Sequence, residues 1–389
     1  FLVHIFGGRL WTALSTALLL IPAFGIGYAL QNPDTPYLIF LVLALLCGFG
    51  GGNFASSVAH VSYFFPKSEK GSALALNTGL GNVGVSIMQL VIPVAVTMSL
   101  FGALGGQSQI ASDGTRLWMQ NAGFLWVPFI VIGVLAAWFG MNDIASAKSS
   151  FADQAVIFGR RDTWLMSWLY TGTFGTFIGM SAGFPLLSAL VFPEIDALRY
   201  AFIGPLVGAL SRAASGWMAD RLGGARVSFW VFVVMIFAVL GMIWALEMKS
   251  FAGFFAMVLA LFVVSGVGNA STFQMVPHIM RRVIGVDGAS AAEQPGLTIQ
   301  ADRESAAITG FISAIAAYGA FYIPKAYGTS IASTGSPDAA LWGFVLFYLS
   351  CAIVTWRFYS GPSGLLSHRR SPAPEAAGAG PRSALEGSQ

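Results

Sequence analysis

Long apolar runs separated by short polar connections are the dominant pattern of this chain. A helix that crosses a bilayer needs about 20 mostly apolar residues. After an apolar remnant at residues 1–6, ten runs of this kind follow, and each predicts one membrane-spanning helix: 10–30, 36–65, 71–101, 122–141, 163–191, 198–217, 227–246, 252–280, 304–324 and 339–358. The pattern therefore predicts an all-α polytopic membrane protein.

Composition supports this class. Of the 389 residues, 56% are hydrophobic and 10% are charged, whereas a soluble domain carries about 25% charged residues. The net charge of +3 does not indicate a nucleic-acid partner. Cys47 and Cys351 fall inside apolar runs, so we interpret them as small core residues rather than a disulfide or a metal site.

The basic residues predict an orientation. One alternating set of connections carries most of the Lys and Arg residues, while the other carries Arg116, Arg199, Lys249 and Lys325. Because cytoplasmic loops are enriched in Lys and Arg, the first set and the C-terminus are predicted to be cytoplasmic. The basic tail could contact anionic lipid, although a merely solvated end is the simpler interpretation.

The sequence also repeats itself. The motif GxGNxxS at residues 50–56 recurs as GxGNxxT at residues 266–272, 216 positions later. The motif GxxN at 79–82 recurs as GxxS at 310–313, and in both places Ile-Pro follows. This common order predicts two homologous six-helix halves related by an axis along the membrane normal.

The repeat predicts a domain organisation. Completing the first half requires helix 1 and most of helix 2 before Phe1, which makes twelve helices in the whole protein. The expected parts are the remainder of the N-terminal half (1–141), a cytoplasmic linker (142–162), the C-terminal half (163–358) and a disordered cytoplasmic tail (359–389).

Arg212 is the most informative residue, because the other charged residues lie in or beside polar connections. A charge near the bilayer midplane costs several kcal/mol unless it has a partner or a water-filled cavity. The apolar runs offer no carboxylate partner, so an anion that comes and goes is the natural candidate. Subtracting the repeat of 216 from Arg212 predicts a second arginine upstream, at position −4.

Other polar and aromatic residues can share the depth of Arg212. A rise of about 1.5 Å per residue places Tyr170, Phe273, Ser313, Asn82 and Phe54 roughly 12–20 Å inside a core about 30 Å thick. On residue type alone, the two phenylalanines are most simply core packing, and Asn82 and Ser313 are interhelical hydrogen-bonding groups. Tyr170 fits a packing role and a functional role equally well.

No enzymatic constellation is visible in the sequence. His60 and His278 have no neighbours with metal-ligand spacing, and nucleophile–base pairs, phosphate loops and carboxylate dyads are missing. The sequence therefore predicts neither an enzyme nor a metal or other cofactor.

Several segments resemble the nitrate/nitrite porter family of the major facilitator superfamily. In the first half these are GFGGGNFASSVAHVSYFFPK and GSALALNTGLGNVGVSIMQL. In the second half they are GALSRAASGWMADRLGG, SGVGNASTFQMV and ITGFISAIAAYGAFYIP. The resemblance covers essentially residues 1–358.

This resemblance implies roles for the candidate residues. Arg212 matches one of two substrate-binding arginines, Tyr170 matches a tyrosine that bonds the anion, and Phe54 and Phe273 match aromatic residues that sandwich it. Asn82 and Ser313 lie in the paired nitrate-signature segments. The signature and helix-packing positions are Gly79, Gly81, Gly84, Gly310, Gly319, Gly52, Asn53, Gly268 and Asn269.

The sequence departs from the family at a few positions. Thr78, Ala316 and Ala320 replace glycines of the signature segments, and extra methyl groups between sliding helices would slow their movement. The loop at residues 7–9 lacks the acid that Asp220 supplies in the second half.

The resemblance implies a monomeric nitrate/nitrite antiporter of the bacterial inner membrane that works by rocker-switch alternating access. The lack of an interior carboxylate disfavours proton coupling. Alternatives are a proton-coupled nitrate symporter, a carrier of another oxyanion such as an organic phosphate, and a sensor that binds an anion without transporting it.

Overall fold

The computed structural model describes residues 2–64, 67–111, 113–143 and 150–366. Its first group of elements precedes the central connection of the chain. This group comprises α1 (Leu2–Phe6), α2 (Gly8–Leu18), α3 (Leu20–Ala29), α4 (Tyr37–Phe64), α5 (Lys67–Ala95), η1 (Gly102–Gly105), β1 (Gln109–Ile110), β2 (Arg116–Leu117), α6 (Asn121–Phe124) and α7 (Trp126–Gly140).

The second group starts in the central connection with α8 (Phe151–Ala155) and η3 (Val156–Gly159). It continues with α9 (Arg161–Tyr170), η4 (Thr171–Gly175), α10 (Thr176–Val191), η5 (Ala197–Tyr200), α11 (Ile203–Ala214), α12 (Gly216–Leu222), α13 (Gly224–Glu247), α14 (Phe251–Ile284), η6 (Val286–Gly288), α15 (Gln294–Ala317), α16 (Gly319–Thr334), α17 (Asp338–Thr355) and η7 (Trp356–Ser360).

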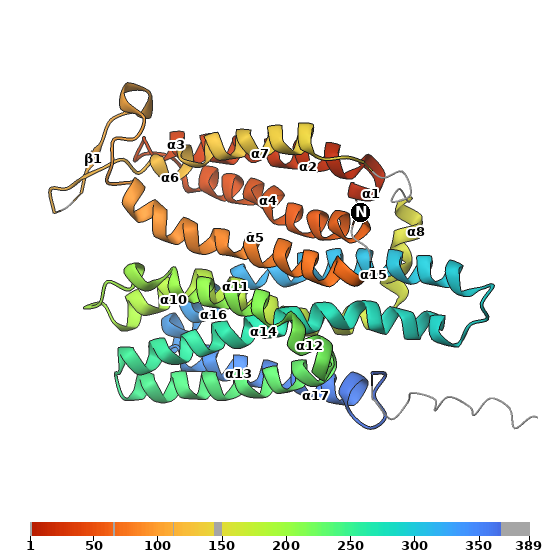
Figure 1. Ribbon diagram of the computed structural model, residues 1–389. Helices are drawn as coiled ribbons and strands as arrows, with labels where there is room; N and C mark the ends of the chain where they lie inside the picture. The colour runs from red at the N-terminus through yellow and green to blue at the C-terminus, as the bar shows by residue number, and fades with distance from the viewer. Residues whose placement is uncertain (1, 65–66, 112, 144–149, 367–389) are drawn as a thin grey trace, which may run out of the picture.

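The two groups form two stacked layers of nearly parallel and antiparallel helices (Figure 1). Helices α1–α7 lie in the upper layer and α9–α17 in the lower one. The layers meet where α5 packs against α11 and where α4 packs against α15. The short antiparallel β1–β2 pair projects from one end of the molecule, here called the hairpin end.

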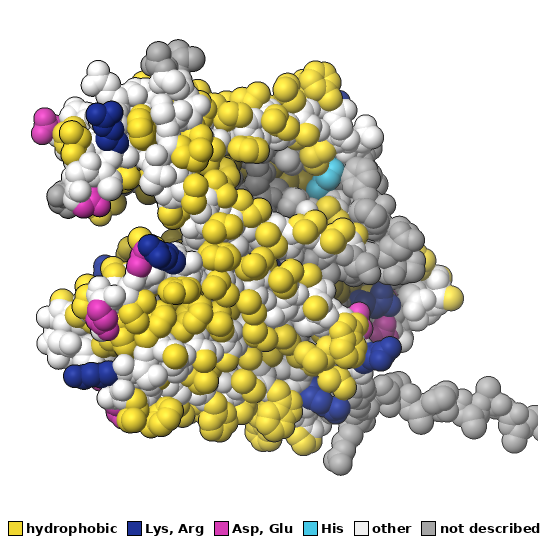
Figure 2. Space-filling view, turned by 60° about the vertical axis from the view of Figure 1, so that its left-hand side comes forward, with side chains coloured by type: hydrophobic (Ala, Val, Ile, Leu, Met, Phe, Trp, Pro, Cys, Tyr) yellow, Lys and Arg dark blue, Asp and Glu magenta, His cyan; other side chains and the backbone are white. Residues whose placement is uncertain are grey.

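The surface is that of a membrane protein. On the face shown in Figure 2, hydrophobic side chains cover the middle of the molecule and charged side chains gather toward its two ends. Among the described residues, nine helices are long and apolar enough to span a bilayer. The predicted span 198–217 is wrong as one continuous helix: its residues form η5, α11 and the start of α12.

The break between α11 and α12 is a single residue, Ser215. The Ser215 hydroxyl donates to the Arg212 carbonyl oxygen at 3.3 Å, and Gly216 follows directly. Serine side chains that bond nearby backbone carbonyls compete with the helical hydrogen-bond ladder, and glycine favours its interruption.

Other predicted boundaries also shift. Helix α5 starts at Lys67 and ends at Ala95, rather than spanning 71–101, and the predicted 304–324 span lies within the longer α15–α16 segment. The predicted linker contains α8 and η3, while residues 144–149 lie outside the described part.

The expected disordered tail starts too early. Residues up to 366 are folded: Tyr359 is fully buried, and the Leu365 and Leu366 amides donate to the carbonyls of residues 358 and 359. The rest of the predicted tail, 367–389, lies outside the described residues.

Candidate anion-binding site

Arg212 lies on α11 and is only 2% exposed. Its Nη2 donates to the Tyr170 hydroxyl at 3.3 Å. Its Nη1 is buried without a hydrogen-bond partner, and no carboxylate pairs with it anywhere in the described chain. The guanidinium therefore keeps an unused N–H donor in a buried, positively charged place, which favours an anionic ligand.

Three aromatic rings surround the same guanidinium. The Arg212 Cζ lies 5.6 Å from the ring centre of Phe54, 5.9 Å from that of Phe174 and 5.0 Å from that of Phe273. These rings come from α4, η4 and α14, so both layers contribute to the site. A cation within about 6 Å of a ring face gains roughly 0.5–2 kcal/mol, which offsets part of the cost of burying Arg212.

The rings are stacked differently from the predicted sandwich. Phe54 stacks on Phe174 at 5.5 Å with an interplanar angle of 9°, and Phe174 stacks on Tyr170 at 5.2 Å and 11°. Phe273 instead tilts against Tyr170 at 47°. Phe54 and Phe273 both contact Arg212, but the ring that faces Phe54 is Phe174.

The sequence reasoning missed Phe174. Phe174 follows Tyr170 by four positions, and this spacing places two side chains on one face of a helix. Phe174 lies within η4, a single π-helical turn that starts directly after Tyr170. Such turns are rare and are common at functional sites, but no residue pattern announces this one.

The other two predicted polar residues lie beside these groups. Ser313 is buried on α15 and donates to the Thr309 carbonyl at 2.7 Å. Asn82 is buried on α5, and its Nδ2 has no partner among the described residues. Helix α5 packs on α11, the helix that carries Arg212.

Two close backbone approaches hold α11 in place. A Cβ added to Gly266 of α14 would overlap the Gly208 carbonyl oxygen and would lie 3.1 Å from the Arg212 backbone nitrogen. A Cβ added to Gly79 of α5 would lie 3.1 Å from the Ala213 Cβ. Glycine at these two positions lets α14 and α5 approach α11 on either side of Arg212.

The remaining signature glycines divide into two sets. Added Cβ atoms at Gly268 and Gly319 would meet Thr173 and the Gly175 backbone, respectively, so both serve close packing. Added Cβ atoms at Gly52, Gly81 and Gly84 would meet nothing within 4 Å, because these glycines are on exposed helix faces. The helix-packing role predicted for these three is therefore not found in this structure.

Gly310 shares α15 with the substituted position Ala316, whereas Thr78 is on α5 and Ala320 is on α16. Gly310 is partly exposed on α15. Thr78 and Ala316 are buried, and the Ala316 carbonyl oxygen would lie 3.1 Å from a Cβ added to Gly175. Ala320 on α16 is partly exposed.

The repeat-related asparagines have different surroundings. Asn53 accepts from Ser15 at 2.6 Å and donates to Thr16 at 2.8 Å, which joins α4 to α2. Asn269 is fully buried, yet neither side-chain polar atom has a partner in the described chain. The 216-residue offset places Val231 and Phe232 where the first half has Ser15 and Thr16. These apolar side chains cannot bond Asn269 as the two hydroxyls bond Asn53.

Two acidic residues modify the expectations from sequence. Glu304, at the start of a predicted span, is only 4% exposed, so a buried carboxylate does exist. It is already paired, because Arg160 donates two 3.0 Å hydrogen bonds to it. The loop at residues 7–9 has no acid of its own, but Asp143, from the end of the first half, accepts from the Arg9 amide through its Oδ1 at 2.9 Å.

Comparison with known proteins settles the family. The Major Facilitator Superfamily model matches residues 1–292. The chain is 47% identical to the nitrate/nitrite transporter NarU of Salmonella typhimurium over 92% of this chain and 79% of that protein. It is 40% identical to the probable nitrate/nitrite antiporter NarK2 of Thermus thermophilus, with the same coverage. The chain belongs to the nitrate/nitrite porter family of this superfamily.

Solved structures agree on the fold. The human organic anion transporter MFSD10 superposes with a TM-score of 0.63 over 91% of this chain and 78% of that one, at 13% identity. The transporter FucP in its outward conformation gives 0.54 over 90% and 82%, at 15% identity. The predicted fold class is thus confirmed, and so is the interpretation of this porter-family member as a transporter rather than an enzyme.

Proposed function

We propose that this protein exchanges nitrate and nitrite across the bacterial inner membrane, as a multi-pass monomer with a cytoplasmic C-terminus. The observation that carries the proposal is the buried Arg212 guanidinium, which has an unpartnered Nη1, a tyrosine hydroxyl on Nη2 and three aromatic rings around it. The names of the relatives, nitrate/nitrite transporters, support the substrate.

The chemistry of the site suits a small planar oxyanion. Guanidinium N–H groups form planar, multidentate hydrogen bonds to oxyanions. The free Nη1 supplies one such donor to the substrate. The stack of Phe54, Phe174 and Tyr170 presents flat apolar faces, which favour a planar anion over a bulkier tetrahedral one.

Exchange follows from the uncompensated charge. Closing the site around Arg212 without an anion, as each switch between the two sides of the membrane requires, would leave a cation buried in a low dielectric, which costs several kcal/mol. A bound anion removes that penalty, so the loaded carrier should cross more readily than the empty one. The second arginine predicted at position −4 would increase this difference.

Proton coupling is the runner-up mechanism. Of the described acidic residues, Glu304 is the buried one, and the Arg160 guanidinium holds it in a bidentate pair. Gln300 donates a further bond to the same carboxylate at 2.9 Å. A carboxylate satisfied in this way is poorly placed to take up and release protons.

The test is nitrate uptake into proteoliposomes. We expect uptake when the lumen holds nitrite or nitrate, and little when only a pH gradient is imposed. Arg212→Gln should abolish uptake, and Arg212→Lys should reduce it more than tenfold because the planar fork is lost. Arg199→Gln, which removes an exposed arginine paired with Asp196, is the matched control.

The alternatives predict different results. Nitrate accumulation driven by a pH gradient without internal anion, and lost in Glu304→Gln, would establish proton symport instead. Nitrate binding without counterflow would identify a sensor. Wild-type nitrate affinity in Arg212→Gln would remove Arg212 from the site.

A further inference from the structure

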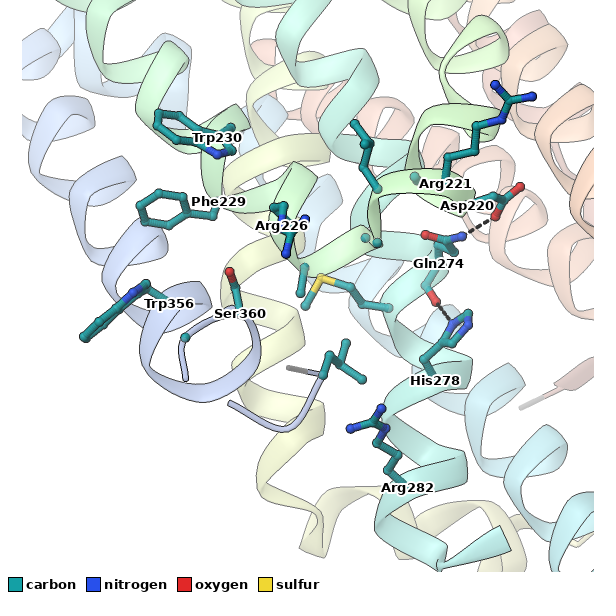
Figure 3. A pocket seen from close by; sticks show the side chains of 18 of the residues that line it. Asp220, Arg221, Arg226, Phe229, Trp230, Gln274, His278, Arg282, Trp356 and Ser360 are labelled. Atoms are coloured by element: carbon teal, nitrogen blue, oxygen red, sulfur yellow. Dashed lines mark hydrogen bonds between the residues drawn. The ribbon is translucent and has the colours of Figure 1, made fainter. Parts of the chain in front are cut away.

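A cavity separate from the Arg212 site lies at the end of the molecule opposite the hairpin end. It has a volume of about 630 Å³ and opens between α12, the start of α13, the second half of α14 and the segment 356–366 (Figure 3). Its charged lining comprises Asp220, Arg221, Arg226 and Arg282. Nothing in the exchange mechanism uses this cavity.

The cavity has an excess of positive charge. None of its three arginines forms an ion pair with a carboxylate among the described residues. Arg282 donates instead to the Leu365 carbonyl oxygen, which ties it to the wall of the cavity. Asp220 already accepts a hydrogen bond from Gln274. Arg226 and Arg282 are therefore the cavity arginines available to an added anion, whereas the Arg221 guanidinium lies over the Trp217 ring, 5.4 Å from its centre.

The backbone of α13 adds to the same field. This 24-residue helix begins at Gly224, its cap residue is Gly223, and no side chain caps its N–H groups. The N-terminus of a helix carries about half a positive charge, so a basic residue in its first turn is unfavourable. Arg226 occupies that turn, beside N–H groups that no side chain caps. An anion bound there would offset the repulsion between Arg226 and the helix N-terminus and would accept hydrogen bonds from those N–H groups.

The rim of the cavity indicates where the anion comes from. Trp230 and Trp356 line the cavity and are 60% and 51% exposed. Trp230 follows Arg226 by one helical turn on α13, a helix that also exposes Val234 and Phe237 on its outer surface. Exposed tryptophans next to arginines, at the end of a lipid-facing helix, are typical of the headgroup level of a bilayer.

We propose that this cavity binds the phosphate of an anionic phospholipid, with Arg226, Arg282 and the first turn of α13 as the phosphate donors. Basic pockets between helices, at the ends of membrane spans, suit such headgroups. The Gln274 Oε1 is buried without a partner and lines the cavity, so it can accept from a headgroup hydroxyl. Phosphatidylglycerol supplies both a phosphodiester and hydroxyl groups.

The experiment is native mass spectrometry of the detergent-purified full chain with phosphatidylglycerol or phosphatidylcholine. We expect phosphatidylglycerol to be retained preferentially, and the variant R226Q/R282Q to retain it at least fivefold less. The matched control R116Q/R199Q removes two exposed arginines elsewhere and should retain the lipid normally. Nitrate exchange measured on the same samples shows that each variant is folded.

Three outcomes would overturn the proposal. One is equal retention of phosphatidylglycerol by the wild type and R226Q/R282Q, and another is an equal loss in R116Q/R199Q. The third is displacement of the lipid by glycerol phosphate or inorganic phosphate at the same phosphate concentration, which would identify a soluble anion as the occupant. Should R226Q/R282Q fail to fold, Arg282→Lys with Trp230→Leu replaces it and should reduce retention at least threefold.

Discussion

At the scale of single residues, Arg212 shows how a buried charge is accommodated before any substrate binds. One hydrogen bond that Arg212 donates to Tyr170 and three ring contacts take the place of an ion pair. None of these partners can neutralise the charge, and Nη1 keeps an unused donor. Asn269 and Asn82 also hold unpartnered buried polar atoms, so unsatisfied groups are found on both layers.

Phe174 is the residue whose role is most sharply testable. Phe174→Leu keeps an apolar side chain but removes the ring that contacts Arg212 and stacks on Phe54 and Tyr170. Loss of a cation–π contact of about 0.5–2 kcal/mol should weaken nitrate binding roughly 2- to 30-fold. Binding calorimetry on the purified protein measures this change.

The control for Phe174 is Phe184→Leu. Phe184 is equally aromatic and buried but stacks on Phe254, away from Arg212. The Phe184→Leu variant should have a lower thermal stability than the wild type and an unchanged nitrate affinity. Equal affinities in the wild type and Phe174→Leu would show that the ring is packing material only.

At the scale of elements, the π-turn η4 sets the geometry of the site because Tyr170 precedes it and Phe174 lies within it. Helix α16 holds this turn in place through a direct backbone approach: a Cβ added to Gly319 would overlap the Gly175 carbonyl oxygen. The α16–η4 contact therefore transmits any shift of α16 to the site, although neither glycine touches Arg212.

We expect Gly319→Ala to destabilise the protein by about 1–3 kcal/mol, the usual cost of overpacking, and to slow exchange. Gly328→Ala on the same helix is the matched control, since its Cβ would meet nothing within 4 Å. It should be neutral or stabilise α16 by up to about 1 kcal/mol. Melting temperatures and exchange rates of the two variants provide the measurement, and identical effects would contradict the packing argument.

At the scale of the whole molecule, few polar bonds join the two layers. One that does is Gln89 of α5, whose Nε2 donates to the Ser181 carbonyl oxygen of α10 at 2.8 Å. Most of the remaining contact is apolar packing of α5 on α11 and of α4 on α15. Apolar surfaces slide and separate with little directional preference, so the Gln89 bond has a large share in fixing how the layers sit.

Gln89→Leu should therefore favour states in which the layers separate near α5 and α10. Loss of a hydrogen bond worth about 1 kcal/mol shifts such an equilibrium roughly fivefold. Spin labels at positions 114 and 336, in a Cys47→Ser background, report the separation as a distance distribution. Met88→Leu, at the exposed neighbouring position, is the control, and an unchanged distribution in Gln89→Leu would contradict the role.

Much of the fold could be predicted from local patterns. Most of the apolar runs coincide with helices within a few residues, but the 198–217 run is divided among η5, α11 and the start of α12. The site was predicted less completely. Arg212, Tyr170, Phe54 and Phe273 do come together, whereas Phe174 was missed because the π-turn that aligns it with Tyr170 has no sequence signal.

The sequence by itself determined the membrane-spanning class, the family and the buried cation, because hydropathy and charge act over single segments. Only the tertiary structure decided which ring faces Phe54, why Asn269 lacks the partners of Asn53, and that Arg160 pairs with Glu304. Each of these depends on contacts between helices that are distant in the chain. Their geometry follows from how whole helices pack, which residue order in one segment does not encode.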